Sequence, residues 1–230
     1  GANDVIGKPA NDAVLLARVR NLLRARAGVE FAAGEAMAAQ GFAEPALAFD
    51  CGATVAVVAS QIDAARRLQQ ELAGELGDRL LAMSRPQALA EAATVAAGPG
   101  GVPDVFILQQ DGSDSASTLR LLSELKSHQT TRHSAVCVLG RSGESDEAAI
   151  AFDLGADDVV GPDVTAAELA LRTRSLIRRK QRGDQKRARI EDGLRLAMVD
   201  PLTGLYNRRY AMPRFFFNDT ATTETGTAFA

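Results

Sequence analysis

The side chains most often used in catalysis and metal binding are scarce in this sequence. Its only imidazoles, His128 and His133, flank a Thr-Thr-Arg segment with no carboxylate partner suggested, and its only thiols are Cys51 and Cys137. The cysteines lie far apart and form no Cys-x-x-Cys pair, so neither a zinc site nor a disulfide framework is predicted. We expect Cys137 to be a small core residue and the protein to fold in a reducing compartment.

A second chemical candidate is a strongly basic segment, residues 172–195. Its ten basic residues are Arg172, Arg174, Arg178, Arg179, Lys180, Arg182, Lys186, Arg187, Arg189 and Arg195. Against three acidic residues they give this segment a formal charge of +7, which leaves -10 for the rest of a chain whose net charge is -3. A basic helix can bind nucleic-acid phosphates, but no aromatic residues are interleaved and no DNA-binding motif is present. Charge matching within or between subunits is therefore favoured over nucleic-acid binding.

The composition is that of an ordinary globular protein. The chain has 230 residues, 46% hydrophobic and 24% charged, which excludes collagen, mucin and wholesale disorder. It has no run of about 18 apolar residues and no charged segment followed by an apolar leader, so neither a membrane span nor a secretion signal is expected. A cytoplasmic location is predicted. The first residue is Gly rather than Met, which suggests a fragment.

Five short apolar runs alternate with stretches of helical periodicity, which predicts an α/β fold with a parallel five-stranded sheet and crossover helices. The runs are continuously apolar, as expected for strands that helices cover on both faces. The predicted strands are 53–59, 79–83, 104–108, 135–139 and 158–160, and the predicted helices are 62–76, 86–97, 117–127, 144–154 and 165–182. The predicted buried stripes are Leu68, Leu72 and Leu76 in the first helix and Leu119, Leu122 and Leu125 in the third.

The chain also contains an internal repeat. Residues 1–7 (GANDVIG) match residues 155–161 (GADDVVG), and the match continues for 26 residues. It joins Ala13, Leu15, Arg18, Arg20, Leu22 and Arg24 to Ala167, Leu169, Arg172, Arg174, Leu176 and Arg178, in that order. Residues 1–27 are therefore interpreted as the end of one domain and residues 51–182 as a complete second copy.

The remaining segments are interpreted as connections and ends. Residues 28–50, rich in Ala and Gly, are predicted to be a linker. Gly183 is expected to break or kink the basic helix, followed by a stalk helix over residues 183–199. Residues 215–230 have three Phe before a Thr/Ala-rich stretch and fit neither helical nor strand periodicity. They are interpreted as an anomalous tail with the look of a frame-shifted, vector-derived or adapter-derived sequence.

Two stretches carry a family resemblance. Five strand–helix units that end in Gly155-Ala-Asp-Asp before the last strand resemble the flavodoxin-like (βα)5 receiver domain of two-component response regulators, and residues 1–9 (GANDVIGKP) are similar to the segment in which Lys-Pro closes its fifth strand. Residues 200–210 (DPLTGLYNRRY) resemble the entry sequence of GGDEF domains, the diguanylate cyclases. The matched positions of this entry turn are Asp200, Leu202, Thr203, Gly204, Asn207 and Arg208. Over residues 1–214 the order is that of PleD-type response regulators, in which tandem receivers precede a GGDEF domain.

The resemblance implies a phosphorylation site whose residues the complete copy lacks. A receiver needs a nucleophilic aspartate after strand three, an acidic pair after strand one for Mg²⁺, and a hydroxyl and a lysine for the phosphoryl charge. These positions fall here on Gln109, on Ala59 and Ser60, on Gly140 and on Pro162. An amide cannot attack a phosphoryl group as a carboxylate does. The second copy is therefore predicted to be a pseudo-receiver that cannot be phosphorylated.

Other acidic and basic residues have simpler interpretations. Asp111, Asp114 and Asp63 could be nominated as substitutes for the missing carboxylates, but Asp111 precedes Gly112, a pair that favours a tight turn. Lys8 takes the place of the phosphoryl-contacting lysine of the first receiver and is expected to be an exposed lysine here. Asp200 and Thr203 can cap a new helix.

The resemblance implies a regulatory fragment of a response regulator with cyclic di-GMP output, in which the pseudo-receiver serves dimerisation. Mg²⁺ and GTP are implied for the parent protein only. No catalytic, cofactor or metal residue is assigned to this chain, because the GG[DE]EF loop lies downstream, and the chain alone is expected to be inactive. The expected partners are a second copy and, for the parent, a sensor histidine kinase or phosphotransfer protein, with no membrane. The alternatives are a stand-alone receiver acting as a protein-interaction adaptor and a nucleic-acid-binding regulator.

Overall fold

The computed structural model describes residues 11–36, 52–77, 79–94, 101–110, 115–140 and 146–198. Several sequence predictions lie outside these residues. They are Lys8, Cys51, Asp111, Asp114, the entry turn from Asp200 to Arg208 and the tail 215–230.

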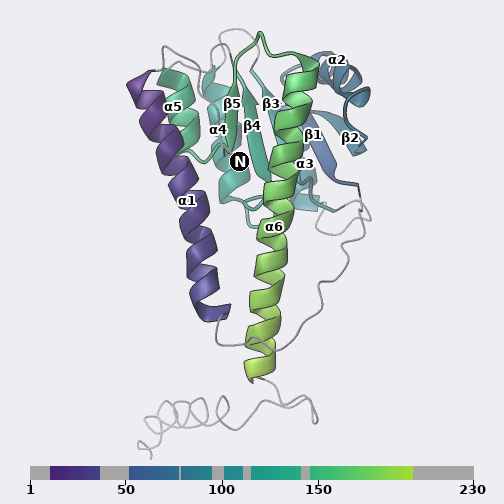
Figure 1. Ribbon diagram of the computed structural model, residues 1–230. Helices are drawn as coiled ribbons and strands as arrows, with labels where there is room; N and C mark the ends of the chain where they lie inside the picture. The colour runs from purple at the N-terminus through teal and green to yellow at the C-terminus, as the bar shows by residue number, and fades with distance from the viewer. Residues whose placement is uncertain are drawn as a thin grey trace, which may run out of the picture. The chain divides into compact units, whose positions relative to one another are not determined.

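A five-stranded parallel sheet forms the centre of the fold (Figure 1). Its strands are β1 (Thr54–Ala59), β2 (Arg79–Ser84), β3 (Val105–Gln109), β4 (Ala135–Leu139) and β5 (Asp158–Val160). They lie in the order β2-β1-β3-β4-β5, and every neighbouring pair is parallel. This is the flavodoxin-like doubly wound order, which confirms the predicted fold class.

Helices cover both faces of the sheet, as continuously apolar strands require. They are α1 (Asp12–Ala36), α2 (Ile62–Ala73), α3 (Arg85–Thr94), α4 (Ser115–Ser127), α5 (Asp146–Asp153) and α6 (Ala166–Met198). One core cluster joins alternate strand residues such as Phe106 and Val138 to α3, α4, α5 and the start of α1. The other joins Ile107 and Cys137 to α2 and α6.

The predicted elements are all present among the described residues, with bounds that differ by up to three residues. Helix α2 ends at Ala73 rather than at residue 76, so Leu76 is buried as predicted but lies just after the helix. Three further differences are larger. In α4, Leu121 is buried and Leu119 only partly so, because Thr118, Leu121, Leu122 and Leu125 form the buried face. Helix α1 continues to Ala36, past the predicted linker boundary at residue 28. Helix α6 runs unbroken from Ala166 to Met198 through Gly183, so the expected break does not occur there.

The chain divides into two compact units. The first comprises residues 1–28 and 45–183 and holds the sheet, and the second comprises 29–44 and 184–230. In the described part of the second unit, Arg187 forms an ion pair with Asp184 one turn away on α6. Within the described residues, no helix is both long and apolar enough to cross a membrane.

Cys137 supplies a first prediction, because it is a fully buried thiol in the middle of β4. Burial raises its pKa well above the ordinary value, and the nearby Asp158 carboxylate raises it further. The native thiol therefore stays protonated at a pH where the unfolded thiol ionises. We expect the free energy of unfolding to fall as the pH rises above about 8.5, by at most about 1.4 kcal/mol per pH unit from this group.

The measurement is urea unfolding from about pH 7 to about pH 10 in a Cys51→Ala background, with and without Cys137→Ala. The difference between the two pH slopes isolates the contribution of Cys137. Equal slopes would contradict the prediction, as would rapid maleimide labelling of native Cys137.

Candidate functional site

The carboxyl edge of the sheet gathers the five positions singled out from the sequence. Ala59 ends β1 and Ser60 follows it, Gln109 ends β3, Gly140 follows β4, and Pro162 lies two residues after β5. Ala59 and Gly140 are buried, whereas Pro162 is exposed. Among these five positions no carboxylate is available to attack a phosphoryl group or to hold Mg²⁺, a cation that prefers carboxylate oxygens. The set does not fit that metal.

Gln110 fills part of this edge instead. Its Nε2 donates a hydrogen bond to Glu147 Oε2 on α5 at 3.2 Å, and its backbone N–H donates to Leu139 O at 2.9 Å. A Cβ atom on Gly140 would lie 3.0 Å from Gln110 Oε1, closer than most van der Waals contacts. The neighbouring Gln109 Oε1 is buried and has no hydrogen-bond partner in the described structure. In the described part of this edge, the side chains at the end of β3 and just after it are therefore amides, one of them paired with Glu147.

The other candidate residues do not form a reactive site. Asp63 lies exposed in the first turn of α2, paired with Arg66 at 3.6 Å. His128 is exposed and contacts Thr130, and His133 is exposed and accepts a hydrogen bond from Arg132. Within the described ranges no cluster of His, Cys, Asp and Glu could hold a metal ion.

Charged groups gather instead at the start of β5, around two adjacent carboxylates. Asp157 accepts a hydrogen bond from Lys126 of α4 at 2.8 Å and one from Arg179 of α6 at 3.2 Å. It also accepts one from the backbone N–H of Val136, so it fixes the β4–β5 register. The turn before it depends on Gly155, whose φ of +102° few other residues adopt.

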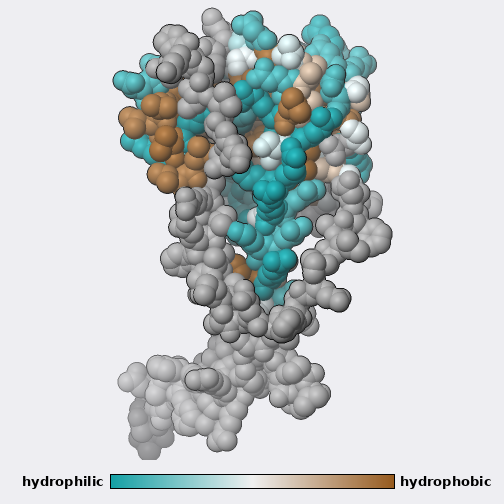
Figure 2. Space-filling view, viewed as in Figure 1, coloured by the Kyte–Doolittle hydropathy of each residue, from teal (hydrophilic) through white to brown (hydrophobic). Residues whose placement is uncertain are grey.

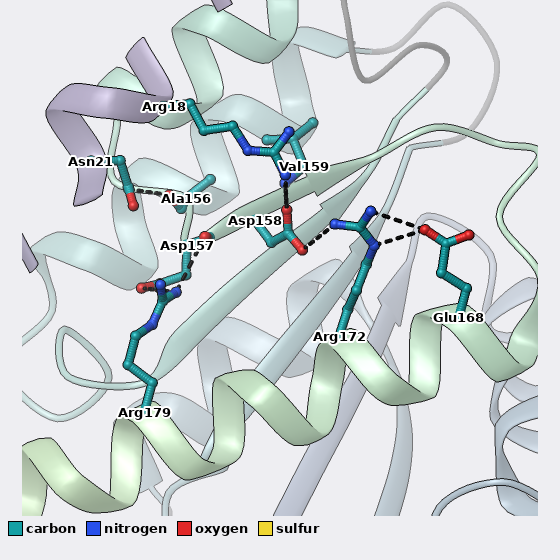
Figure 3. A network of polar contacts seen from close by, with 9 residues as sticks. All are labelled: Arg18, Asn21, Ala156, Asp157, Asp158, Val159, Glu168, Arg172 and Arg179. Atoms are coloured by element: carbon teal, nitrogen blue, oxygen red, sulfur yellow. Dashed lines mark hydrogen bonds and ion pairs between the residues drawn. The ribbon is translucent and has the colours of Figure 1, made fainter. Parts of the chain in front are cut away.

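Asp158 is held by two arginines from different helices (Figure 3). Arg18 of α1 contacts its Oδ1 at 3.1 Å and Arg172 of α6 contacts its Oδ2 at 3.1 Å. The Arg18 and Asp158 side chains are only 10% and 13% exposed. Burial alone would lower the pKa of Arg172, but Asp158 and Glu168, with their charges and hydrogen bonds, together raise it. Arg172 therefore stays charged at physiological pH.

Helix α1 docks beside this ion cluster through a face that we call the docked face of α1: Val14, Ala17, Arg18 and Asn21. All four residues are buried, with Val14 and Ala17 in the core cluster of the sheet. Asn21 donates to Ala156 O at 2.6 Å, and the Arg18 guanidinium lies 5.5 Å from the Phe152 ring centre.

Arg24, one turn further along α1, donates to Phe152 O and Asp153 O at the end of α5. A cation suits the carbonyls left unpaired at a helix C-terminus. Helix α1 therefore stabilises the last turn of α5 as well as the ion cluster.

The opposite side of α1 is apolar and exposed. We call this the apolar face of α1: Leu15, Leu16, Val19 and Leu23, which are 38–59% exposed. In Figure 2 hydrophobic side chains gather at this side of the molecule, over the upper part of α1. A contiguous exposed apolar surface on a folded protein is typical of a site where another protein segment packs.

The basic segment is partly neutralised within the chain. Arg172, Arg179 and Lys180 pair with Asp158, Asp157 and Asp104, and Arg187 pairs with Asp184. Among the described side chains of this segment, four basic residues are therefore matched to carboxylates of the same chain.

The sequence alone did not single out Asp157, Asp158, Asn21 or Lys126 as functional residues. The signal that could have found them is the repeat, because it places Arg18 and Arg172 at the same spacing after Asp4 and Asp158. It does not show that both arginines reach the same carboxylate.

The chain is similar to known response regulators. It is 30% identical over 216 residues to the response regulator PleD of Caulobacter vibrioides, a match that covers 91% of this chain and 45% of the relative. The chain thus spans about half the length of the curated relatives it matches. No family model matches it.

Solved structures similar to the chain include two from bacterial response regulators. A receiver domain protein from Clostridium thermocellum has a TM-score of 0.47 and 25% identity, covering 56% of this chain and 97% of its own. A putative response regulator from Chloroflexus aurantiacus has a TM-score of 0.44 and 21% identity, covering 55% and 98%.

The ion cluster yields a second prediction. Replacing Asp158 with Ala leaves Arg18 and Arg172 without their shared carboxylate, so we expect a loss of about 3 kcal/mol in the free energy of unfolding. Arg18→Ala leaves Asp158 paired with Arg172 and should lose about 2 kcal/mol. The double variant should lose less than the sum, because both changes remove the same contact.

Urea unfolding followed by circular dichroism measures these values. Glu124→Ala is the matched control, because its pair with Arg120 is exposed and should contribute less than about 0.5 kcal/mol. Strict additivity of the two losses at Asp158 and Arg18 would contradict the shared-contact interpretation.

Proposed function

We propose that this chain, which belongs to the response regulators as a PleD homologue, is the regulatory part of a longer protein with two receivers and diguanylate cyclase output. Its five-stranded unit is a receiver domain. In this proposal residues 1–27 end a first receiver and residues 51–182 are the second. Residues 183–199 form the stalk and residues 200–214 begin the cyclase domain. Because α1 continues to Ala36, the connection between the receivers shortens to the residues that follow.

The proposal of a first receiver before residue 28 rests mainly on the apolar face of α1. Through the repeat, its four residues correspond to Leu169, Ala170, Thr173 and Ile177 of α6, in that order. On α6 these positions are at most 7% exposed and face the sheet. Helix α1 therefore has the sheet-facing side of a last receiver helix, which supports a sheet of its own that precedes it.

The second receiver is proposed to act by packing rather than by phosphorylation. Ala59, Ser60, Gln109, Gly140 and Pro162 supply neither nucleophile nor metal ligands of the required kind. Phosphorylation by a histidine kinase or phosphotransfer protein would take place on the first receiver. The docking of α1 beside β5 supports this role, because it shows a surface of the second receiver engaged by another element.

The cyclase output rests on residues 200–210, which follow α6 and resemble the GGDEF entry sequence. Joining two GTP molecules into cyclic di-GMP requires two cyclase domains to face each other, so the proposed parent acts as a homodimer and uses Mg²⁺. A long helix such as α6 suits a stalk between receiver and cyclase.

The output is tested with the natural protein extended through its downstream codons. Incubated with GTP and Mg²⁺, the extended protein should form cyclic di-GMP, whereas the present chain should form none, as followed by chromatography. Product from the present chain, or an extended protein that lacks a GG[DE]EF loop, would overturn the proposed output.

The pseudo-receiver is tested with Gln109→Asp. Because the acidic pair at positions 59 and 60 is still missing, this variant should gain no detectable phosphorylation from acetyl phosphate and Mg²⁺, as judged by intact-protein mass. A typical isolated receiver domain serves as the positive control. Acetyl-phosphate-dependent addition of one phosphoryl group to the unmodified chain would refute the proposal.

A further inference from the structure

The two edges of the sheet differ in their protection against pairing with another strand. An edge strand presents unpaired backbone N–H and C=O groups, and proteins close such edges with short strands, charged side chains, proline or a covering helix. At one edge, β5 has only three residues, carries Asp158 and has α1 docked beside it. At the other edge, β2 is the outermost strand on the side of α2 (Figure 1) and has six residues. Its residues 80–84 (LLAMS) include no charged residue and no proline.

The free side of β2 follows from its pairing with β1. The two strands are parallel, and the N–H of Arg79 donates to Ala53 O at 3.0 Å. Successive residues of a strand direct their backbone groups to alternate sides, so the bonds to β1 come from Arg79 and from every second residue after it. The other three residues therefore direct their N–H and C=O groups away from the sheet: Leu80, Ala82 and Ser84.

Two glutamines, from helices on opposite faces of the sheet, occupy part of these outward groups. Gln69 of α2 donates from Nε2 to Leu80 O at 2.8 Å. Gln87 of α3 accepts from the backbone N–H of Ser84 at 2.9 Å and from its hydroxyl at 3.0 Å. Among the described contacts, the outward N–H of Leu80 and both outward groups of Ala82 have no hydrogen-bond partner.

The bond of Gln87 also has a local role. Ser84 precedes α3, and a Gln three residues after a Ser forms a capping box when its side chain reaches back to the N–H of the Ser. The bond of Gln69 is not a local cap, because it joins α2 to a carbonyl eleven residues further along the chain on β2. Gln69 is therefore the better reporter of the edge.

Packing does not cover the start of β2. A groove of about 590 Å³ opens between the end of α2 and the start of β2, lined by Gln69, Gln70, Ala73, Leu76, Gly77 and Leu80. Leu80, Leu81 and Ala82 are only partly buried. The edge is therefore accessible, and hydrogen bonds rather than covering side chains occupy its outward groups.

A second copy of β2 matches these outward groups in one register. Hydrogen-bonded residues of an antiparallel pair exchange both of their N–H···O bonds, and a two-fold axis can place Ala82 opposite Ala82 of the second copy. Leu80 of one copy then lies opposite Ser84 of the other, and the Ser84 N–H would donate to the Leu80 O. These are the two groups that Gln87 and Gln69 occupy. Both glutamines thus act on the same inter-chain bond, one at its donor and one at its acceptor.

We infer that Gln69 and Gln87 close the free edge of β2, and that the strand they exclude is β2 of a second copy of this chain. The inference does not depend on the proposed function, because it uses only contacts within the five-stranded unit. With both glutamines in place, only Ala82 offers its N–H and its C=O outward together. One such residue does not hold a neighbouring strand, so the sheet ends at β2.

The test is sedimentation equilibrium of this chain over a range of concentrations, with Gln69→Ala and with Gln69→Ala/Gln87→Ala. The double variant frees the donors and acceptors of two inter-chain hydrogen bonds, so it should associate at least about tenfold more tightly than the unmodified chain. Gln70→Ala is the matched control and should leave association unchanged. Gln70 is exposed, adjoins Gln69 and has no hydrogen bond among the described contacts.

Ala82→Pro separates the edge of β2 from every other surface. Proline removes the outward N–H of residue 82, which β1 does not use, and edge strands tolerate proline. Added to the double variant, it should return association to the level of the unmodified chain. Association that Ala82→Pro does not reverse would overturn the inference, as would a folded double variant that associates no more than the unmodified chain. Gln69→Ala alone keeps the capping box of α3, so it decides in the same way if circular dichroism shows the double variant unfolded.

Discussion

Two neighbouring carboxylates that are both largely buried require positively charged side chains close to them. The helices packed around β5 supply these side chains, and the arrangement of the region depends on these ion pairs. Asp157 and Asp158 are compensated by Lys126 from α4, by Arg172 and Arg179 from α6 and by Arg18 from α1. A largely buried charge without a partner is strongly destabilising. Each of the three helices is therefore held at a fixed position relative to the strand, and these side-chain contacts add to the backbone pairing of the three-residue β5 with β4.

Much of the fold was predictable because the physical signals are local. Continuously apolar runs such as residues 135–139 are typical of strands covered on both sides, and their alternation with helices favours a parallel sheet. The end of a helix is a weaker signal. A single glycine in a helix costs only about 1 kcal/mol relative to alanine, so α6 continues through Gly183, supported just beyond it by the pair between Asp184 and Arg187. In α4, Leu119 lies three residues before Leu122 and Leu121 lies four residues before Leu125, so helical spacing alone does not decide which of the two leucines is buried.

The two candidate sites also differ in how much of each could be predicted from the sequence. The five positions Ala59, Ser60, Gln109, Gly140 and Pro162 could be placed from the sequence because each ends or closely follows an apolar run, and parallel strands bring those ends to one edge. The contacts around Asp158 could not be, because they join residues about 140 positions apart. Equivalence within the repeat says that Arg18 and Arg172 occupy the same place in two copies. Only their three-dimensional arrangement reveals that the two places meet.

The amide packing at the carboxyl edge has a consequence for how such a domain can evolve. Gln110 is tethered to Glu147 and lies where any side chain at position 140 would have to begin. A side chain at position 140 would displace the Gln110 amide by a few tenths of an ångström and so disturb its hydrogen bond to Glu147 at the start of α5. Positions 110, 140 and 147 are therefore coupled, because a side chain added at one of them changes the packing of the other two.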